Sequence, residues 1–316
     1  MTGGTLPMTE TLLKEKGIKE LKKLGGFHNV IYEGLYQDTP IIIRKSTRRT
    51  LSEIEEEVHI LNSVGDDVHT IRPIKVGGAF VREHEDGVYA FFKKDDGLNW
   101  HETTLTDTTH YNAGKALGLL HKAFQKMDTK KRASYDAHPD LKLIKTSTPF
   151  HQEEARKLLK TIASWDKPKN EYGLIHGDYL FGNLLYHGED VTVIDFDDME
   201  YGFYLYDVAV YLFYLLLGGN PKDIHKEPNI EIFKHFIKGY RSVNKQTNLD
   251  FDKLNTLFRL RQLKLLGTIM KTMDASKHGP WQKAYIEMAN HQLEKDEPFV
   301  EIPFQSIYES LNKNED

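Results

Sequence analysis

The spacing of apolar and polar residues changes near residue 95. Before that point, short runs rich in β-branched and aromatic residues are separated by Gly and Asp, which predicts an antiparallel meander of strands. After Asp95-Asp96-Gly97, apolar residues recur at three- and four-residue steps, a spacing typical of amphipathic helices. The pattern therefore predicts an α+β fold with a small β-rich lobe over residues 1–94 and a larger helical lobe over residues 95–316. The predicted strands cover residues 29–36, 40–45, 72–82 and 87–92.

Two helices are expected within the small lobe. Leucines placed among lysines and glutamates predict a short amphipathic helix over residues 10–24, ending at Gly25-Gly26. Ser52, with Glu55 three residues later, forms a capping box, and apolar residues continue from there with helical spacing. A second helix is therefore predicted to run through residue 64.

The second part of the chain reads as a series of helices interrupted by one polar island. The island covers residues 172–202, is punctuated by Gly and Asp, and contains two short strand-like runs at residues 183–186 and 191–194. We expect these two runs to form a hairpin with its turn at residues 187–190. The predicted helices cover residues 107–127, 149–165, 205–217, 230–243, 252–273 and 281–293.

Composition narrows the range of functions. The chain has no cysteine, which excludes disulfides, thiolate metal sites and cysteine nucleophiles. A net charge of -5 and a pI near 6.3 argue against broad nucleic-acid binding. The longest apolar run, residues 208–217, is about half of the roughly 20 residues that a membrane span needs. Because the first residues lack the apolar block of a secretion signal, we expect a cytoplasmic protein with no membrane partner.

The polar island carries residues suited to phosphoryl transfer. His176-Gly177-Asp178 is followed by Asn183 and, after the expected hairpin, by Asp195. Transfer to a hydroxyl needs a carboxylate beside the attacking oxygen and hard oxygen ligands for magnesium. Asp178 fits the catalytic carboxylate, and Asn183 and Asp195 fit the metal ligands. The cofactors expected from this chemistry are ATP and Mg²⁺.

These motifs resemble those of the aminoglycoside phosphotransferase and choline kinase superfamily. His-Gly-Asp with Asn five residues after the Asp, followed by Ile194-Asp195-Phe196-Asp197, is the pattern that carries the resemblance. The resemblance implies a protein-kinase-like two-lobed fold and an ATP- and Mg-dependent kinase that acts on a small-molecule hydroxyl. It does not name the acceptor.

The same resemblance implies roles for two charged residues of the small lobe. It places a phosphate-binding basic residue at Arg44 on the strand over residues 40–45, with Lys45 as the alternative. Strand alternation puts Ile42 and Arg44 on one face. The family usually has lysine there, although arginine can contact phosphates through a planar pair of donors. Glu57 is the expected helix partner of this base, and Glu53, Glu55 and Glu56 are the alternatives.

Two further parts of the nucleotide site are implied by the resemblance. Gly26 lies in Gly25-Gly26-Phe27-His28-Asn29, where the family has its nucleotide-covering loop, although a plain turn is an equal alternative. Residues 90–93, including Phe91 and Phe92, would form the hinge whose backbone reads the adenine edge.

The acidic and aromatic stretch after Asp195 suggests the chemistry of the acceptor. Asp198, Glu200 and Tyr201 follow the metal-binding position closely, so we predict an acceptor that carries an amine beside its hydroxyl. The alternative is that Asp197 tunes the metals while Asp198 and Glu200 face solvent.

Two other functions share parts of this pattern. A protein Ser/Thr kinase uses the same chemistry, but the residue before Asp178 is not arginine, and no Ser or Thr occurs between residues 193 and 241 to serve in an activation segment. A non-catalytic nucleotide-binding module would be expected to have lost one of Asp178, Asn183 and Asp195. His176 is expected to shape its loop through hydrogen bonds, and His121 to pack beneath it.

Overall fold

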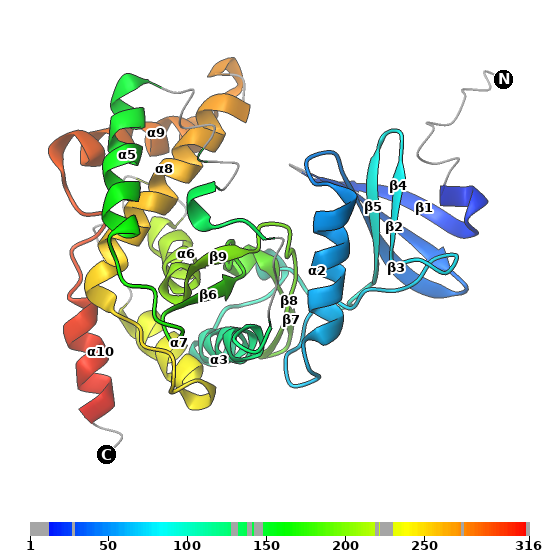
Figure 1. The fold of residues 1–316 in the computed structure, drawn as a ribbon, viewed down its shortest axis with the longest axis horizontal. Helices are drawn as coiled ribbons and strands as arrows, with labels where there is room; N and C mark the ends of the chain where they lie inside the picture. The colour runs from blue at the N-terminus through cyan, green and yellow to red at the C-terminus, as the bar shows by residue number, and fades with distance from the viewer. Residues whose placement is uncertain are drawn as a thin grey trace.

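The computed structural model of the protein describes residues 13–26, 29–127, 132–137, 141, 148–218, 221, 230–272 and 275–313. Figure 1 shows two lobes side by side, a β-sheet with one helix on the right and a larger group of helices on the left. The β-rich part comes first in the chain and the helical part second. The predicted α+β class and the order of its two parts are therefore confirmed.

The small lobe is built on an antiparallel five-stranded sheet with the order β1-β2-β3-β5-β4. Alternation along β3 explains how it serves two surfaces. Ile41 and Ile43 are completely buried in the core of the lobe, whereas Ile42 and Arg44 face the opposite side. The strands are β1 (Ile18–Gly25), β2 (Val30–Tyr36), β3 (Thr39–Ser46), β4 (Val81–His84) and β5 (Gly87–Lys93).

The helix predicted over residues 10–24 is wrong over most of its described part. Residues 13–15 are helical, but Ile18–Gly25 forms β1, and residues 10–12 lie outside the described residues. Ile18 is 2% exposed and pairs with Tyr36 of β2, so pairing with the sheet outweighs the helical spacing. Lysines on such an edge strand discourage pairing with other chains.

Two other boundaries in the small lobe differ from the prediction. The strand expected over residues 72–82 is confined to Val81–His84. Helix α2 (Leu51–Ser63) begins earlier than expected, because its cap is Thr50 and not Ser52. The Thr50 side chain accepts a hydrogen bond from the Glu53 amide, and the Glu53 carboxylate accepts one from the Thr50 amide.

The large lobe contains the predicted helices, with end points that shift by a few residues. It also contains strands β6 and β9, which pair with each other, and a last helix, α10. The sequence pattern did not predict these. The helices are α3 (Asp107–Phe124), α5 (Pro149–Ala163), α6 (Tyr204–Leu217), α7 (Ile230–Val243), α8 (Leu254–Thr272), α9 (Pro280–Lys295) and α10 (Phe304–Lys313). The strands are β6 (Tyr172–Ile175), β7 (Leu184–His187), β8 (Asp190–Val193) and β9 (Glu200–Phe203).

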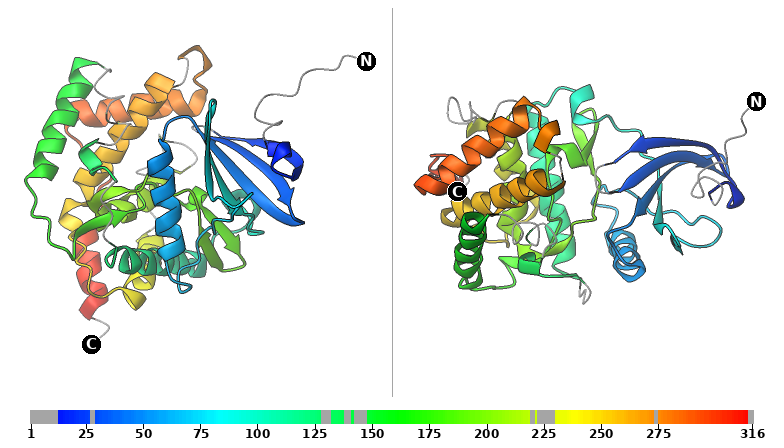
Figure 2. Two further views of the ribbon diagram at one scale, coloured as in Figure 1. Left: turned by 45° about the vertical axis from the view of Figure 1, so that its right-hand side comes forward. Right: turned by 90° about the horizontal axis from the view of Figure 1, so that it is seen from above.

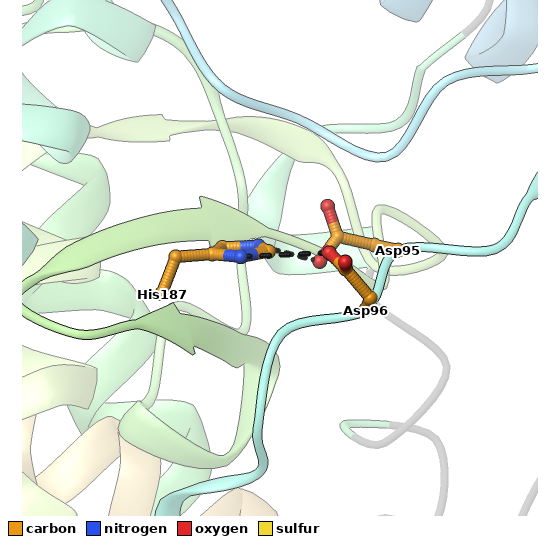
Figure 3. Close-up of side chains that lie close together, drawn as sticks. All are labelled: Asp95, Asp96 and His187. Carbon is orange, nitrogen blue, oxygen red and sulfur yellow. Dashed lines mark hydrogen bonds and ion pairs between the residues drawn. The ribbon is translucent and has the colours of Figure 1, made fainter.

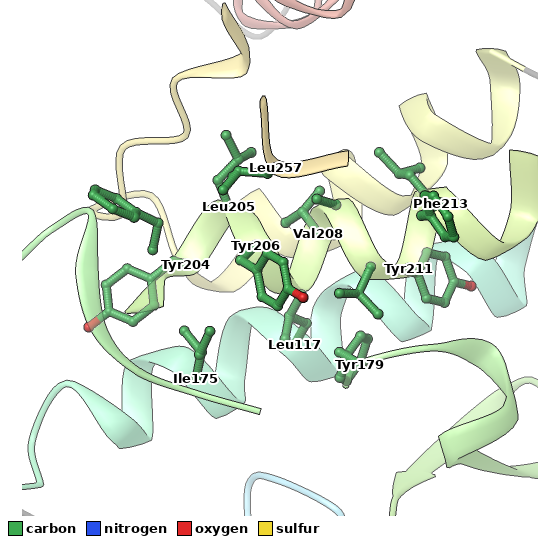
Figure 4. Packing of buried hydrophobic residues seen from close by; sticks show 14 of the residues in the cluster. Leu117, Ile175, Tyr179, Tyr204, Leu205, Tyr206, Val208, Tyr211, Phe213 and Leu257 are labelled. Carbon is green, nitrogen blue, oxygen red and sulfur yellow. The ribbon is translucent and has the colours of Figure 1, made fainter. Parts of the chain in front are cut away.

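Helix α6 forms the centre of the large lobe. Its side chains Tyr206, Val208 and Tyr211 are buried and pack beside Leu117 of α3 and Tyr179 of the loop after β6 (Figure 4). The strongly apolar run at residues 208–217 is thus the core of a globular lobe, as predicted. None of the helices in the described part of the chain is long and apolar enough to cross a membrane.

The two lobes touch beside the hairpin formed by β7 and β8. The Ile71 amide donates to the Val193 carbonyl (3.0 Å), and the Val193 amide donates to the His69 carbonyl (2.9 Å). The segment between α2 and β4 therefore pairs with β8 of the large lobe. The right view of Figure 2 shows this narrow junction between the sheet and the helices.

Candidate active site

A fully buried carboxylate anchors the loop after β6 through hydrogen bonds. Asp207, at the start of α6, accepts hydrogen bonds from the amides of His176 and Gly177, each at 2.8 Å. Gly177 has φ of +81°, and a Cβ at this position would lie 2.1 Å from the Asp198 carbonyl oxygen. Only glycine fits there, so the loop must turn at residue 177 and present Asp178.

Two histidines support this loop without reaching its open side. His176 Nδ1 accepts from the Asp178 amide (3.3 Å), and its Nε2 donates to the Ile194 carbonyl (3.1 Å). His121 is completely buried, and its Nε2 lies 3.0 Å from Asp207. The expectation that His176 shapes the loop and His121 packs beneath it is therefore confirmed.

The hairpin brings Asp178, Asn183 and Asp195 together. The Asn183 amide nitrogen donates to the Asp178 carbonyl (2.9 Å) and to Asp178 Oδ2 (3.1 Å). The Ile194 amide donates to the Asn183 carbonyl (3.0 Å), which places Asp195 directly after this contact. Asp195 has φ of +62°, in the left-handed region, a conformation that is uncommon for a residue other than glycine and recurs at functional sites.

Carboxylates crowd this end of the site. Although 49% of the Asp195 side-chain surface is open, desolvation by the surrounding protein raises the pKa of Asp195 to about 7, with further contributions from Asp197, Asp198 and Asp178, while Arg44 lowers it. Asp197 Oδ1 is buried without a hydrogen-bond partner among the described residues. Clustered oxygen donors of this kind fit a hard cation such as Mg²⁺.

The small lobe supplies the positive charge opposite these carboxylates. Arg44 Nη2 donates to Glu57 Oε2 at 2.6 Å, and Arg44 Nη1 lies 3.9 Å from Asp195 Oδ1. Burial alone would lower the pKa of Arg44, but Glu57, Asp197 and Asp195 together raise it above its ordinary value. Lys45 points to the other face of β3 and pairs with Asp86. Of the two candidate bases, the structure therefore brings Arg44 to the site.

A single cavity of about 680 Å³ joins these groups between the lobes. Towards the sheet, the walls are mostly apolar and come from both lobes, whereas the part near α6 and α8 combines polar and apolar side chains. The first group comprises Leu24, Ile31, Ile42, Phe92, Leu185 and Ile194. The second comprises Asp178, Asp197, Asp198, Tyr214, Arg261, Leu265, Thr268 and Ile269.

Most of the predicted nucleotide-site residues line this cavity, but Phe91 does not. Gly26, Arg44, Glu57 and Phe92 all contribute to its walls. Phe91 is completely buried in the small-lobe core; its amide donates to the Phe80 carbonyl and its carbonyl accepts from the Ile74 amide. Both backbone groups of Phe91 are therefore paired inside the lobe, away from the cavity. Phe27 and His28 of the predicted covering loop lie outside the described residues.

The connection between the lobes meets the cavity slightly later in the chain than expected. Lys94, Asp95 and Gly97 line it directly after β5. Asp95 Oδ1 lies 2.7 Å from His187 Nε2 at the end of β7, and Asp96 Oδ1 lies 3.6 Å from Nδ1 of the same ring (Figure 3). These contacts fix the connection against the large lobe.

The three predicted acceptor-binding residues are not placed together. Asp198 lines the cavity, and its Oδ1 accepts from Arg49 at 2.9 Å. Glu200 is 2% exposed and pairs with Lys264 at 3.1 Å, and neither Glu200 nor Tyr201 lines the cavity. Glu200 and Tyr201 belong to β9, which pairs with β6.

Several charged residues of the site were not predicted. Arg261 of α8 contacts Asp178, and Arg49 contacts Asp198 across the two lobes. Arg132 donates to the carbonyls of Asp197 (3.2 Å) and Glu53 (3.1 Å). Arg49 lies close to Arg44 and Lys45 in the sequence, whereas Arg132 and Arg261 have no local motif, and only the folded chain reveals their partners.

A known protein family matches most of this chain. Residues 21–241, which include the cavity residues from both lobes up to Tyr214, match the model of the phosphotransferase enzyme family. The chain belongs to this family. The resemblance inferred from the sequence is therefore confirmed.

Several relatives of this protein match nearly the whole chain. An amicoumacin kinase from Bacillus subtilis (strain 168) is 24% identical over 309 residues, which is 91% of each protein. The solved structure of an amicoumacin kinase in complex with AMP-PNP and Ca²⁺ has a TM-score of 0.84 at 20% identity and covers 96% of this chain and 97% of its own. A microcompartment-associated aminopropanol kinase has a TM-score of 0.68 at 20% identity, covering 91% and 98%. These structures confirm the kinase-like fold.

Proposed function

We propose that this phosphotransferase transfers the γ-phosphoryl group of ATP, with magnesium, to a hydroxyl of a small molecule. The observation that carries the proposal is that Asp178, Asp195 and the Arg44–Glu57 pair line one cavity between the lobes, with Asn183 hydrogen-bonded to Asp178. The apolar walls from both lobes suit the flat adenine ring. The relatives named as kinases of amicoumacin and aminopropanol support small-molecule acceptors.

Asp178 has the chemistry to serve as the catalytic base. As the acceptor oxygen bonds to the γ-phosphorus, its proton passes to the Asp178 carboxylate. The bond between the γ-phosphorus and the oxygen that bridges to the β-phosphate breaks, and ADP leaves with that electron pair. Arg44, held by Glu57, faces the phosphates and offsets their charge. The proton then leaves Asp178 for solvent after the product departs.

Asp195 and Asn183 are the residues that would hold magnesium. The amide nitrogen of Asn183 is used by Asp178, so its amide oxygen is the atom left to face a cation. Desolvation and, to a smaller extent, the nearby carboxylates raise the pKa of Asp195, and a divalent ion would stabilise its charged form. When bound, magnesium neutralises phosphate charge.

Two carboxylates in the cavity indicate the chemistry of the acceptor. We infer an acceptor that carries an amine, since Asp197 and Asp198 lie in the same cavity as Asp178 and ammonium groups favour such surroundings. Arg49 already pairs with Asp198, so the acceptor would share this carboxylate with a protein cation. Amicoumacin and aminopropanol are the first compounds to test, because the relatives named for them cover 91–96% of this chain.

Replacing Asp178 separates catalysis from binding. The variant Asp178→Asn should lower kcat by about 10²- to 10⁴-fold because the general base is lost. Calorimetry should show that Asp178→Asn still binds MgATP. Asp195→Ala should bind MgATP more weakly, because a charged metal ligand is removed. The matched control is Asp190→Asn, which changes an exposed carboxyl at the start of β8. Turnover of Asp178→Asn equal to that of the control would contradict the assignment.

A further inference from the structure

Arg261 of α8 lines the cavity and has no role in the reaction steps described above. Its Nη2 donates to Asp178 Oδ1 at 2.6 Å and to the Tyr214 hydroxyl at 2.6 Å. The guanidinium carbon lies 5.0 Å from the centre of the Tyr214 ring. Arg261 is 9% exposed, and its Nε is buried without a hydrogen-bond partner among the described residues. The guanidinium is therefore fixed by the carboxylate and the ring together.

The contacts of Asp178 show what this arginine contributes. Arg261 binds Oδ1, and the Asn183 amide binds Oδ2 at 3.1 Å. An ionised carboxylate offers about four acceptor positions, so two remain for an incoming hydroxyl. Arg261 can therefore hold the carboxylate in one orientation without excluding the acceptor.

The charge of Arg261 also suits its surroundings. Burial alone would lower the pKa of Arg261, but Tyr214, Asp178 and Tyr206 raise it well above its ordinary value, so the group stays charged. The same wall of the cavity carries Leu265 and Thr268 from the next turns of α8. A fixed positive charge thus lies on the side of Asp178 where α8 closes the cavity.

We propose that Arg261 is a positioning residue for phosphoryl transfer, which holds the carboxylate of Asp178 in the orientation that accepts the proton of the acceptor hydroxyl. The inference rests on the proposed kinase function. It predicts a selective defect, because the Arg44–Glu57 pair and the apolar walls that receive the nucleotide do not contact Arg261. A misplacement of about 1 Å in a reacting group can cost on the order of 10²-fold in rate.

The test compares two arginines of the same helix. Arg261→Met should lower kcat about 100-fold and leave the KM for ATP unchanged, and Arg261→Lys should recover part of the rate because a cation remains. The matched control, Arg259→Met, removes a pair with Asp296 on the surface and should keep the kcat of the wild type. If Arg261→Met does not fold, the variants Arg261→Lys and Tyr214→Phe test the proposal in its place. Both should lower kcat without raising the KM for ATP.

The outcomes separate this inference from the function on which it rests. A wild-type protein that phosphorylates no acceptor would overturn the proposed function. An active wild type with kcat unchanged in Arg261→Met, or in both substitute variants, would overturn the role of Arg261 alone. A proportional loss of kcat and MgATP binding without recovery in Arg261→Lys would show a structural role and would also overturn it.

Discussion

Arg44 and Lys45 are adjacent cations that the fold sends to opposite faces of one strand. Arg44 points into the cavity, where it is 5% exposed and pairs with Glu57. Lys45 points away, pairs with Asp86 and lies over the Tyr89 ring. The sequence left both residues as candidates for the phosphate contact. Side-chain alternation decides which of them reaches the site.

The two cations should therefore respond differently to the same substitution. Arg44→Met should raise the KM for ATP about tenfold or more, since removing one partner of a buried charged pair costs about 2 kcal/mol or more and also removes the phosphate contact. Lys45→Met should leave the KM for ATP within about twofold, because its contacts are on the other face of the strand. Steady-state kinetics with varied ATP measures both values. An equal rise in the two variants would argue against a specific role for Arg44.

At the level of single residues, the sequence predicts what is close along the chain. Asp178, Asn183 and Asp195 could be recognised because one short hairpin brings them together, so local spacing encodes their geometry. Arg261 lies 83 residues from Asp178, and nothing in the pattern of α8 distinguishes it from Arg259. Its role depends on how α8 packs beside α6, which local spacing does not contain.

Helices α3 and α7 cross unusually close together, and glycine makes this contact possible. A Cβ added at Gly239 of α7 would lie 1.8 Å from the Tyr111 carbonyl oxygen, and one added at Gly114 of α3 would lie 1.8 Å from the Phe236 carbonyl oxygen. The obstructing atoms belong to the backbone, so a side-chain rotation cannot relieve the clash. The two helices must therefore move apart if either glycine is replaced.

Gly239→Ala should consequently destabilise the protein. In an exposed helix this change would stabilise by about 1 kcal/mol, but overpacking here should cost about 1–3 kcal/mol or more beyond that gain. Thermal unfolding should show a lower midpoint for Gly239→Ala. Gly65→Ala is the control, because its added Cβ would meet no atom within 4 Å. A higher midpoint for Gly239→Ala than for the wild type would contradict the close crossing.

Secondary-structure elements were predictable where the local pattern and the tertiary contacts agree. The amphipathic helices of the large lobe and strands β2, β3 and β5 follow their apolar spacing. Strand β1 was predicted as a helix because its lysines and leucines fit both periods, and only pairing with β2 decides between them. The ladder of β6 with β9 joins segments about 30 residues apart, and no turn signal reveals that pairing.

Across the whole molecule, charged side chains connect the two lobes beside the cavity. Arg49 of the small lobe contacts Asp197 and Asp198 of the large lobe, and Arg132 of the large lobe donates to the Glu53 carbonyl. The short path from Asp195 to α6 at Tyr204 leaves little chain for a long activation segment. We propose the division near residue 94 as the boundary between two lobes that form one site, since both lobes contribute to the cavity wall.

The most direct test of the central claim is to identify the product of the reaction. Purified protein is incubated with MgATP and a panel of hydroxyl compounds that includes amicoumacin, aminopropanol, aminoglycosides, choline, homoserine and neutral sugars, and both ADP and the acceptor are followed by mass spectrometry. We predict that at least one amine-bearing small molecule gains one phosphoryl group for each ADP formed, and that Asp178→Asn forms neither product. ADP formed without a phosphorylated small molecule, or phosphate recovered only on serine or threonine of added proteins, would contradict the claim.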